Sequence, residues 1–174
     1  MRRILVLGLV LISFAVWSQQ EVQPGKTDMK EAGKIWGEDV GFIYVGIPEK
    51  LLIDSGLVFD FDKIFKVKSG AEKKGYLLMT RAAGRFEYFD YNLYYSNELK
   101  VIKAVVTAYR STRGAGICSK GWLKQFEGYD GKPMKVGEDI QAISGATISA
   151  NSITNDIARC QKLMQNLLNQ GYLQ

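Results

Sequence analysis

Three β-forming runs joined by short turns constrain the fold of this chain more than any other feature. The runs are Gly75 to Ala82, Phe86 to Tyr95 and Leu99 to Tyr109. Each is rich in aromatic or β-branched side chains, which favour extended chain. Connections as short as Ala83-Gly84-Arg85 and Ser96-Asn97-Glu98 join antiparallel neighbours. The sequence therefore predicts an antiparallel β-meander.

The middle run carries aromatic side chains at a period of two, so its two faces differ in content. One face is expected to hold Phe86, Tyr88, Asp90, Asn92 and Tyr94, and the other to hold Tyr91, Leu93 and Tyr95. A stacking surface for a ligand would use such a pattern, but core and cross-strand packing use it more often. We therefore interpret these aromatic residues as core.

A long amphipathic helix is predicted after the meander, from about Ile148 to Gly171. Apolar residues recur at steps of three and four, which is the spacing of one helix face; they are Ile153, Ile157, Cys160, Met164, Leu167 and Leu168. Core packing explains this stripe completely. The predicted fold class is α+β, an antiparallel β-meander sheet packed by a long C-terminal helix and short helices.

Shorter elements are predicted on both sides of the meander. A helix is expected over Met29 to Trp36, with Thr27-Asp28 as its N-cap and Gly37 as its stop; a strand over Val40 to Val45 follows. Extended chain is expected over Val58 to Lys68, whereas Leu51 to Ile64 fits either a strand or a helical turn. After the meander, a short helix over Gly121 to Glu127 would pack three side chains inward: Trp122, Leu123 and Phe126.

The first 18 residues have the pattern of a secretory signal peptide. Two arginines precede an apolar run of 14 residues, Ile4 to Trp17, and Ser18-Gln19 is a plausible cleavage point. A bilayer span needs about 20 residues, so a cleaved signal is favoured, and an uncleaved anchor remains the alternative. We expect an exported protein, periplasmic or associated with the outer side of the cytoplasmic membrane, with a linker over 19–26 and one domain over 27–174.

Composition excludes several classes of function. Removal of Arg2 and Arg3 lowers the 23 basic residues to 21, against 18 acidic ones, and these charges form no basic stripe; a nucleic-acid role is therefore not expected. The chain has no histidine, which excludes His-dependent triads and His metal sites. We predict no metal site and no catalytic residues.

The two cysteines, Cys118 and Cys160, allow two interpretations. In an exported chain they could form a disulfide that ties a glycine loop to the last helix. They could equally be two small buried hydrophobic residues. The sequence leaves both alternatives open.

The stretch from Asp139 to Ser149 is the strongest candidate for a functional site. A short strand ending near Ile143 would turn at Ser144-Gly145 into the last helix. Small residues, hydroxyl groups and a helix N-terminus together favour a phosphate site, and Thr147 offers a nucleophilic oxygen there. The alternative is that Ser144 only caps the helix and nothing binds.

The tetrapeptide Ser144-Gly145-Ala146-Thr147 would open a helix near the end of an exported domain. In this it resembles the FMN-binding domain of the Rnf and sodium-pumping NADH:quinone reductase complexes. That domain also occurs as a free-standing module. In that family the last Thr carries FMN through a phosphoester bond made by a flavin transferase. The resemblance implies Thr147 as the attachment point. The Asp that precedes the motif in the family falls on Gln141 here, with Asp139 two residues earlier.

A second motif supports the resemblance. The family places a glycine loop between its last meander strand and the flavinylated turn, and here Thr112, Gly114 and Gly116 match it in that order. The resemblance covers about residues 75–157. It implies a cofactor site made of Thr147, Ser144, Gly145, Ala146, Ile148, Ser149, Thr112, Gly114 and Gly116. Arg110 or Arg113 could offset phosphate charge.

These observations favour an exported electron carrier over an enzyme with its own substrate. The carrier would exchange electrons with redox partner proteins of the cell envelope, and a flavin transferase would attach its FMN. Two alternatives remain open. The domain could hold FMN or another phosphate ligand without a covalent bond, because Gln141 replaces the family's Asp. It could also be an envelope interaction protein without flavin, associated peripherally with the membrane.

Overall fold

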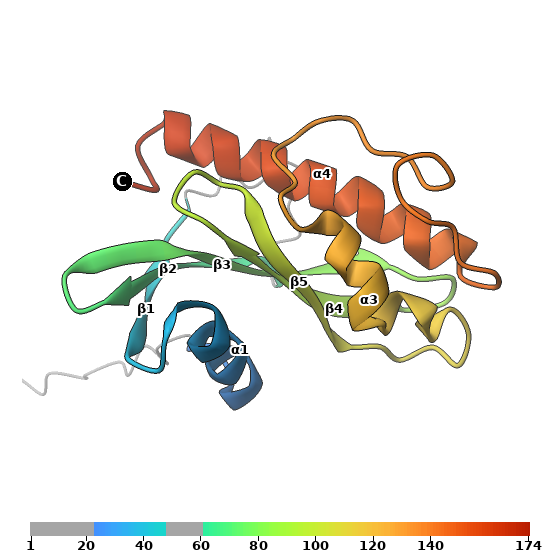
Figure 1. The fold of residues 1–174 in the computed structure, drawn as a ribbon, viewed down its shortest axis with the longest axis horizontal. Coiled ribbons are helices and arrows are strands. Elements are labelled where there is room, and N and C mark those ends of the chain that lie inside the picture. Colours follow the sequence, from blue (N-terminus) through green and yellow to red (C-terminus); the bar gives the residue numbers. More distant parts are fainter. Residues whose placement is uncertain (1–22, 48–60) are drawn as a thin grey trace, which may run out of the picture.

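The computed structural model describes residues 23–47 and 61–174, in which five strands form one antiparallel sheet in the order of the chain. The signal-peptide prediction, the first half of the predicted linker (residues 19–22) and most of Leu51 to Ile64 lie outside these residues. A long helix covers one face of the sheet and a short helix the other (Figure 1). The predicted α+β fold with its meander is thereby confirmed. The strands are β1 (Val40–Val45), β2 (Lys63–Ser69), β3 (Glu72–Ala83), β4 (Tyr88–Tyr95) and β5 (Val101–Ala108).

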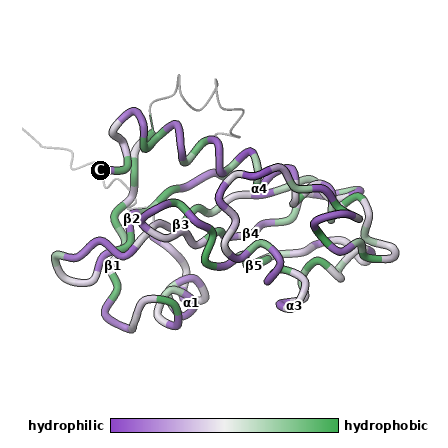
Figure 2. The backbone as a smooth tube through the Cα atoms, turned by 45° about the horizontal axis from the view of Figure 1, so that its top comes forward, coloured by the Kyte–Doolittle hydropathy of each residue, from purple (hydrophilic) through white to green (hydrophobic). Residues whose placement is uncertain are grey.

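Helix α4 (Thr147–Asn169) lies across one face of the sheet and closes the larger core. Its residues alternate between hydrophobic and hydrophilic along the tube in Figure 2, as the predicted stripe requires. The stripe residues from Ile153 to Leu167 are buried and Leu168 is half-buried. They meet Tyr91, Leu93 and Tyr95 of β4, none of which is exposed. The interpretation of the strand aromatics as core is therefore confirmed for Tyr91, Tyr94 and Tyr95, but it is wrong for Phe86 and Tyr88, which are exposed.

Helix α1 (Lys26–Trp36) covers the opposite face, where a smaller core includes Phe65, Leu77 and Tyr94. The predicted N-cap at Thr27-Asp28 is wrong, because the helix begins one turn earlier with Gly25 as its N-cap. The buried Asp28 instead accepts a hydrogen bond from the Gly25 N–H at 2.9 Å and another from the Asn92 amide at 2.6 Å. Asp28 therefore joins the helix start to β4, a role that local sequence does not reveal.

The hairpin between β3 and β4 turns later than predicted. The Gly84 N–H donates to the Glu87 carbonyl at 2.8 Å, so Arg85 and Phe86 belong to the turn and β4 begins at Tyr88. Phe86, placed on a strand face by its period, is 74% exposed in this turn. The shift moves Arg85 to the tip of the hairpin.

The segment after β5 contains three short helical turns: η1 (Ala115–Cys118), α3 (Lys120–Leu123) and η2 (Lys124–Phe126). Trp122, Leu123 and Phe126 are buried, which confirms the predicted short helix and its inward side chains. Both cysteines are free thiols. Cys160 is fully buried and Cys118 half-buried, so the interpretation as small hydrophobic residues holds in this structure and the disulfide does not.

The predicted strand leading to Ile143 is wrong. Residues 135–140 form a tight turn, in which the Lys135 carbonyl accepts from the Asp139 N–H at 2.9 Å and the Asp139 carboxylate accepts from the Lys135 N–H at 3.0 Å. Within the described residues, the β-pairing of this segment is limited to a single bridge between Val136 and Ile140. Local hydrogen bonding thus prevails over the apolar alternation, and Asp139 and Gln141 do not share a strand face.

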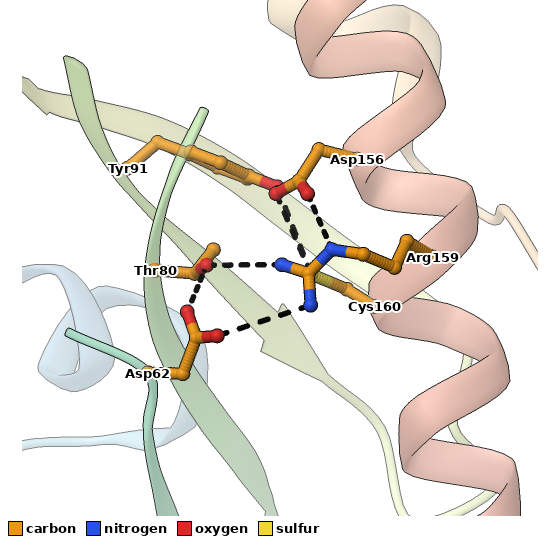
Figure 3. A network of polar contacts seen from close by, with 6 residues as sticks. All are labelled: Asp62, Thr80, Tyr91, Asp156, Arg159 and Cys160. Atoms are coloured by element: carbon orange, nitrogen blue, oxygen red, sulfur yellow. Dashed lines mark hydrogen bonds and ion pairs between the residues drawn. The ribbon is translucent and has the colours of Figure 1, made fainter. Parts of the chain in front are cut away.

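A polar network holds α4 onto the sheet (Figure 3). The Arg159 guanidinium donates to the Asp156 carboxylate at 2.5 Å and lies 3.8 Å from the carboxylate of Asp62, whose side chain is 2% exposed. Asp156 also accepts from the Tyr91 hydroxyl at 2.5 Å. Thr80 on β3 donates to Asp62. Ion pairs this well covered are costly to break, because the remaining charge stays away from water.

We expect replacement of Arg159 by methionine to lower the free energy of unfolding by about 2–3 kcal/mol, since Asp62 and Asp156 then each lose their ion pair with this guanidinium. Urea denaturation at neutral pH measures this. The exposed Lys162 lies on the same helix, so Lys162→Met is the matched control, with an expected change below about 0.5 kcal/mol. Equal effects of the two substitutions would show that the network does not stabilise α4.

Glu31 is expected to make the docking of α1 depend on pH. Its carboxylate contacts Lys34 and lies 2.7 Å from the Lys103 ammonium of β5. The hydrogen bond from Lys103, followed by that from Lys34, lowers the pKa of Glu31 to about 2. A folded-state pKa below the unfolded one gives a stabilisation that is present above the unfolded pKa and is lost as the pH falls toward 2.

We therefore expect Glu31→Gln to lower the free energy of unfolding at pH 7 by about 1 kcal/mol, a value reduced by solvent screening. The difference from the wild type should shrink as the pH falls from 5 to 2. Urea denaturation at several pH values measures it. Glu72→Gln is the control, because the Glu72 side chain pairs with Lys74 but is 70% exposed. A difference that does not change with pH would contradict the assignment.

Candidate functional site

Three segments far apart in the sequence meet at the N-terminal end of α4. They are the β3–β4 turn, the glycine loop that follows β5, and the Gly145–Ser149 junction, which lie at the same end of the molecule in Figure 1. Together they enclose a cleft of about 270 Å³. Its lining residues are Arg85, Arg113, Gly114, Gly145, Ala146, Thr147, Ile148 and Ser149. The two motifs singled out in the sequence thus contribute to one site.

The junction leaves the first turn of α4 without a side-chain cap. Gly145 has φ 75°, and the next N–H, that of Ala146, donates back to the Ile143 carbonyl at 3.1 Å. Ala146 is the N-cap residue and no side chain caps the helix. The alternative in which Ser144 caps the helix is therefore wrong. The amide groups of residues 147–149 begin the helix, and an α-helix offers such groups no internal acceptor.

The predicted hydroxyl cluster separates into different roles. Ser149 is buried, and its Oγ lies 3.0 Å from the hydroxyl of Tyr109. That tyrosine donates to the Arg113 carbonyl at 2.7 Å, so Ser149 donates to Tyr109. Thr147 is exposed, and no described residue forms a hydrogen bond with its hydroxyl. Among the hydroxyls that line the cleft, Thr147 is therefore the accessible one.

The glycine loop packs against the helix start. A Cβ on Gly114, which has φ 85°, would lie 2.6 Å from the Tyr109 hydroxyl oxygen and 3.1 Å from the Ser149 Oγ. A Cβ on Gly116 would lie 2.8 Å from a methyl carbon of Ile143. Both glycines permit close approach of chain to chain, and Gly114 also lines the cleft. Gly116, Thr112 and Ser144 were predicted site residues, but they do not line the cleft.

Positive charge dominates the cleft. Arg85 and Arg113 both line it, and no acidic residue does. Arg110, the other arginine considered from the sequence, turns away: it pairs with Asp90, and this contact raises its pKa. Arg85 was missed because only the tertiary position of the hairpin tip brings it to the helix start. No local pattern in the sequence marks it.

The arrangement suits a phosphate better than an acid–base reaction. Two guanidinium groups and uncapped helix amides favour an oxyanion, and the Thr147 hydroxyl lies beside that position. The lining offers no carboxylate, thiol or imidazole to move a proton. In residues 23–47 and 61–174, no three His, Cys, Asp or Glu side chains gather as a metal site would require. The volume accommodates a phosphate and part of a chain attached to it, with anything larger at the open mouth.

Gln141 occupies the place where the family resemblance expects an aspartate. Its carbonyl accepts from the indole N–H of Trp122 at 2.7 Å, and its N–H donates to the side-chain carbonyl of Gln125 at 2.7 Å. The backbone at this position is thus held by the short helical segment, while the residue is exposed. The side chain is accessible from outside and lies outside the cleft.

Comparisons with known proteins assign this chain to no family. A scan against protein-family models found no match, and a search of curated proteins found none either. Among the described residues, none of the helices is both long and apolar enough to cross a membrane. The chemistry of the cleft is therefore inferred from its own residues.

We expect Gly114→Ala to destabilise the protein more than Gly137→Ala. Both glycines have positive φ, 85° and 91°, so both substitutions strain the backbone by about 1–2 kcal/mol. A new Cβ at Gly137 meets nothing within 4 Å, whereas one at Gly114 collides with Tyr109. The extra cost should be about 1–3 kcal/mol, measured by urea denaturation. Equal destabilisation would contradict the close packing of the two loops.

Proposed function

We propose that this chain is an exported flavoprotein that carries electrons between partner proteins, with FMN esterified to Thr147. One observation supports this above all: the accessible hydroxyl of Thr147 lies at an uncapped helix start, inside a cleft with two arginines and no acidic residue. The FMN phosphate is the group that these residues fit.

Each part of the cleft has a defined task under this proposal. Arg85, Arg113 and the amide groups of the first turn of α4 hold the phosphate and offset its charge. Ser149 and Tyr109 keep the glycine loop in contact with the helix start. The bound FMN would supply the electron-transfer chemistry, and the protein would supply its position and surroundings.

Attachment needs one new bond. In net terms the Thr147 oxygen bonds to phosphorus and one water is lost, so the proton of the hydroxyl leaves with an oxygen of the phosphate. No residue of the cleft is suited to remove that proton, which favours maturation by a separate flavin transferase. The exposed positions of Thr147 and Gln141 are compatible with access by such an enzyme.

Covalent attachment also fits an exported protein. The basic residues Arg2 and Arg3 and the apolar run after them are typical of a signal peptide. A dissociable cofactor would be diluted outside the cell, whereas an esterified one remains with its protein. Redox partners in the cell envelope would then exchange electrons with one bound flavin.

A second candidate is supported by Gln141. The family resemblance places an aspartate there, which helps the transferase to recognise its target, and this chain carries an amide instead. The charges of the cleft would still hold a phosphate without a bond to Thr147. The alternative function is therefore a module that binds FMN, or another phosphate ligand, reversibly.

We expect the mature protein, exported together with a flavin transferase, to gain the mass of one FMN less one water. Intact-mass spectrometry under denaturing conditions measures the increment, and peptide mapping assigns it to Thr147. Thr147→Ala should abolish it. Thr147→Ser, which keeps a hydroxyl, should retain part of it, and Ser144→Ala is the matched control with full loading.

The Gln141→Asp variant separates the two candidates. If the wild type stays unmodified and this variant becomes loaded, recognition by the transferase limits attachment and the wild type binds its ligand reversibly. A denaturation-resistant flavin on Thr147→Ala would overturn the assignment of that residue. Unmodified mass and no flavin absorbance in all variants, including protein from the native envelope, would overturn the proposed function.

A further inference from the structure

Strand β5 is one edge of the sheet, because its pairing partner is β4 alone among the described strands. The chain itself adds to this edge at one point: the Val101 N–H donates to the Tyr129 carbonyl at 3.0 Å, and the Gly128 N–H donates to the Val101 carbonyl at 2.7 Å. The pairing stops there. In residues 23–47 and 61–174, no hydrogen bond occupies the side of Lys103–Val106 that faces away from β4.

A groove of about 410 Å³ runs along this part of the edge. Four consecutive residues of β5 line it, Lys103 to Val106, so the backbone edge itself forms its floor. Helix α1 contributes Glu31 on one side, and the segment from η1 to η2 contributes Cys118, Leu123 and others on the other side. Four residues of extended chain span about 13 Å, which is the length of a short added strand.

The side chains of the groove favour one kind of occupant. The apolar lining residues are the half-buried Val105 and Val106 and the buried Ala104 and Leu123. Lys120 and Lys124 stand four residues apart on the same segment, and neither has an ion-pair partner within the described part of the chain. The groove also has two acidic lining residues, Glu31 and Glu127, of which Glu31 is already balanced by Lys34 and Lys103. Lys120 and Lys124 together outnumber the remaining Glu127. Apolar and acidic side chains on an extended chain would therefore find complementary surfaces here.

We propose that the groove beside β5 binds an extended acidic segment of a partner protein, which adds a strand to the sheet next to Lys103–Val106. Backbone hydrogen bonds to the unpaired edge give the segment its register. Successive side chains of the segment point to opposite faces. Its acidic side chains pair with Lys120 and Lys124 on the side of η1–η2, and its apolar side chains lie against Val105 on the side of α1. Strand addition of this kind is a recurring mode of peptide recognition. The proposal does not depend on a flavin.

The structure provides its own reporter. Cys118 lines the groove and is half-buried, whereas Cys160 is fully buried. Burial raises the pKa of both thiols, so an alkylating reagent should modify Cys118 slowly and leave Cys160 unmodified in the folded protein. An added strand should cover Cys118 and slow the reaction further.

The test uses a capped hexapeptide that alternates glutamate with valine, added to the mature protein. We expect saturable binding by calorimetry, with Cys118 alkylation slowed at least fivefold and amide exchange slowed at Lys103–Val106. The same peptide with N-methylated backbone amides should not bind, because it cannot pair with the edge. A lysine–valine peptide should bind at least tenfold more weakly.

Matched variants test the charges. Lys120→Ala combined with Lys124→Ala should weaken binding about five- to tenfold, whereas Lys132→Ala combined with Lys135→Ala, which removes exposed lysines outside the groove, should not change it. Equal binding of the N-methylated peptide would overturn strand addition. No binding, or β5 amides already protected in the free monomer, would overturn the proposal. The exchange protection of the β5 amides could instead rise with protein concentration, in parallel with dimer formation measured by sedimentation. That result would overturn the proposal, because it would show that the β5 edge pairs with a second copy of this chain and not with a partner protein.

Discussion

The position of α4 on the sheet decides where the candidate site can form. An apolar stripe gives the helix a face to bury, but a stripe alone tolerates sliding and rotation along the sheet. The Arg159 guanidinium, held between Asp156 of the same helix and Asp62 beside β2, fixes one turn of the helix against the strands. The helix start is then held beside the β3–β4 turn, which is where the cleft lies.

The second constraint is the close contact between the glycine loop and the helix start. Gly114 leaves space that the Tyr109 hydroxyl and Ser149 fill, so two segments about thirty residues apart in the sequence behave as one wall. A family resemblance ascribes such glycines to the ligand. In this structure a side chain at either glycine would meet other parts of the protein, and the loop that holds Gly114 also brings Arg113 to the cleft that Thr147 lines.

The sequence predicted what short-range patterns determine. The meander followed from β-branched and aromatic runs with short turns, α4 from its stripe, and the junction at Gly145 from a glycine that must adopt positive φ. It failed where local polar hydrogen bonds override an apolar pattern, and where distant contacts decide. The expected strand before Ile143 yields to a turn closed by Lys135 and Asp139, and Arg85 joins the cleft only because the sheet brings the hairpin tip there.

The cleft and the groove lie at opposite ends of η1. Gly114, just before this turn of helix, lines the cleft, and Cys118, its last residue, lines the groove. Four residues of 3₁₀-helix rise about 8 Å, so a strand added to β5 would bring its protein close to whatever Thr147 carries. The proposed function would need such an arrangement, because a cofactor esterified to one chain cannot travel to its partner. The partner must instead dock beside it, and an edge strand gives that docking a defined register.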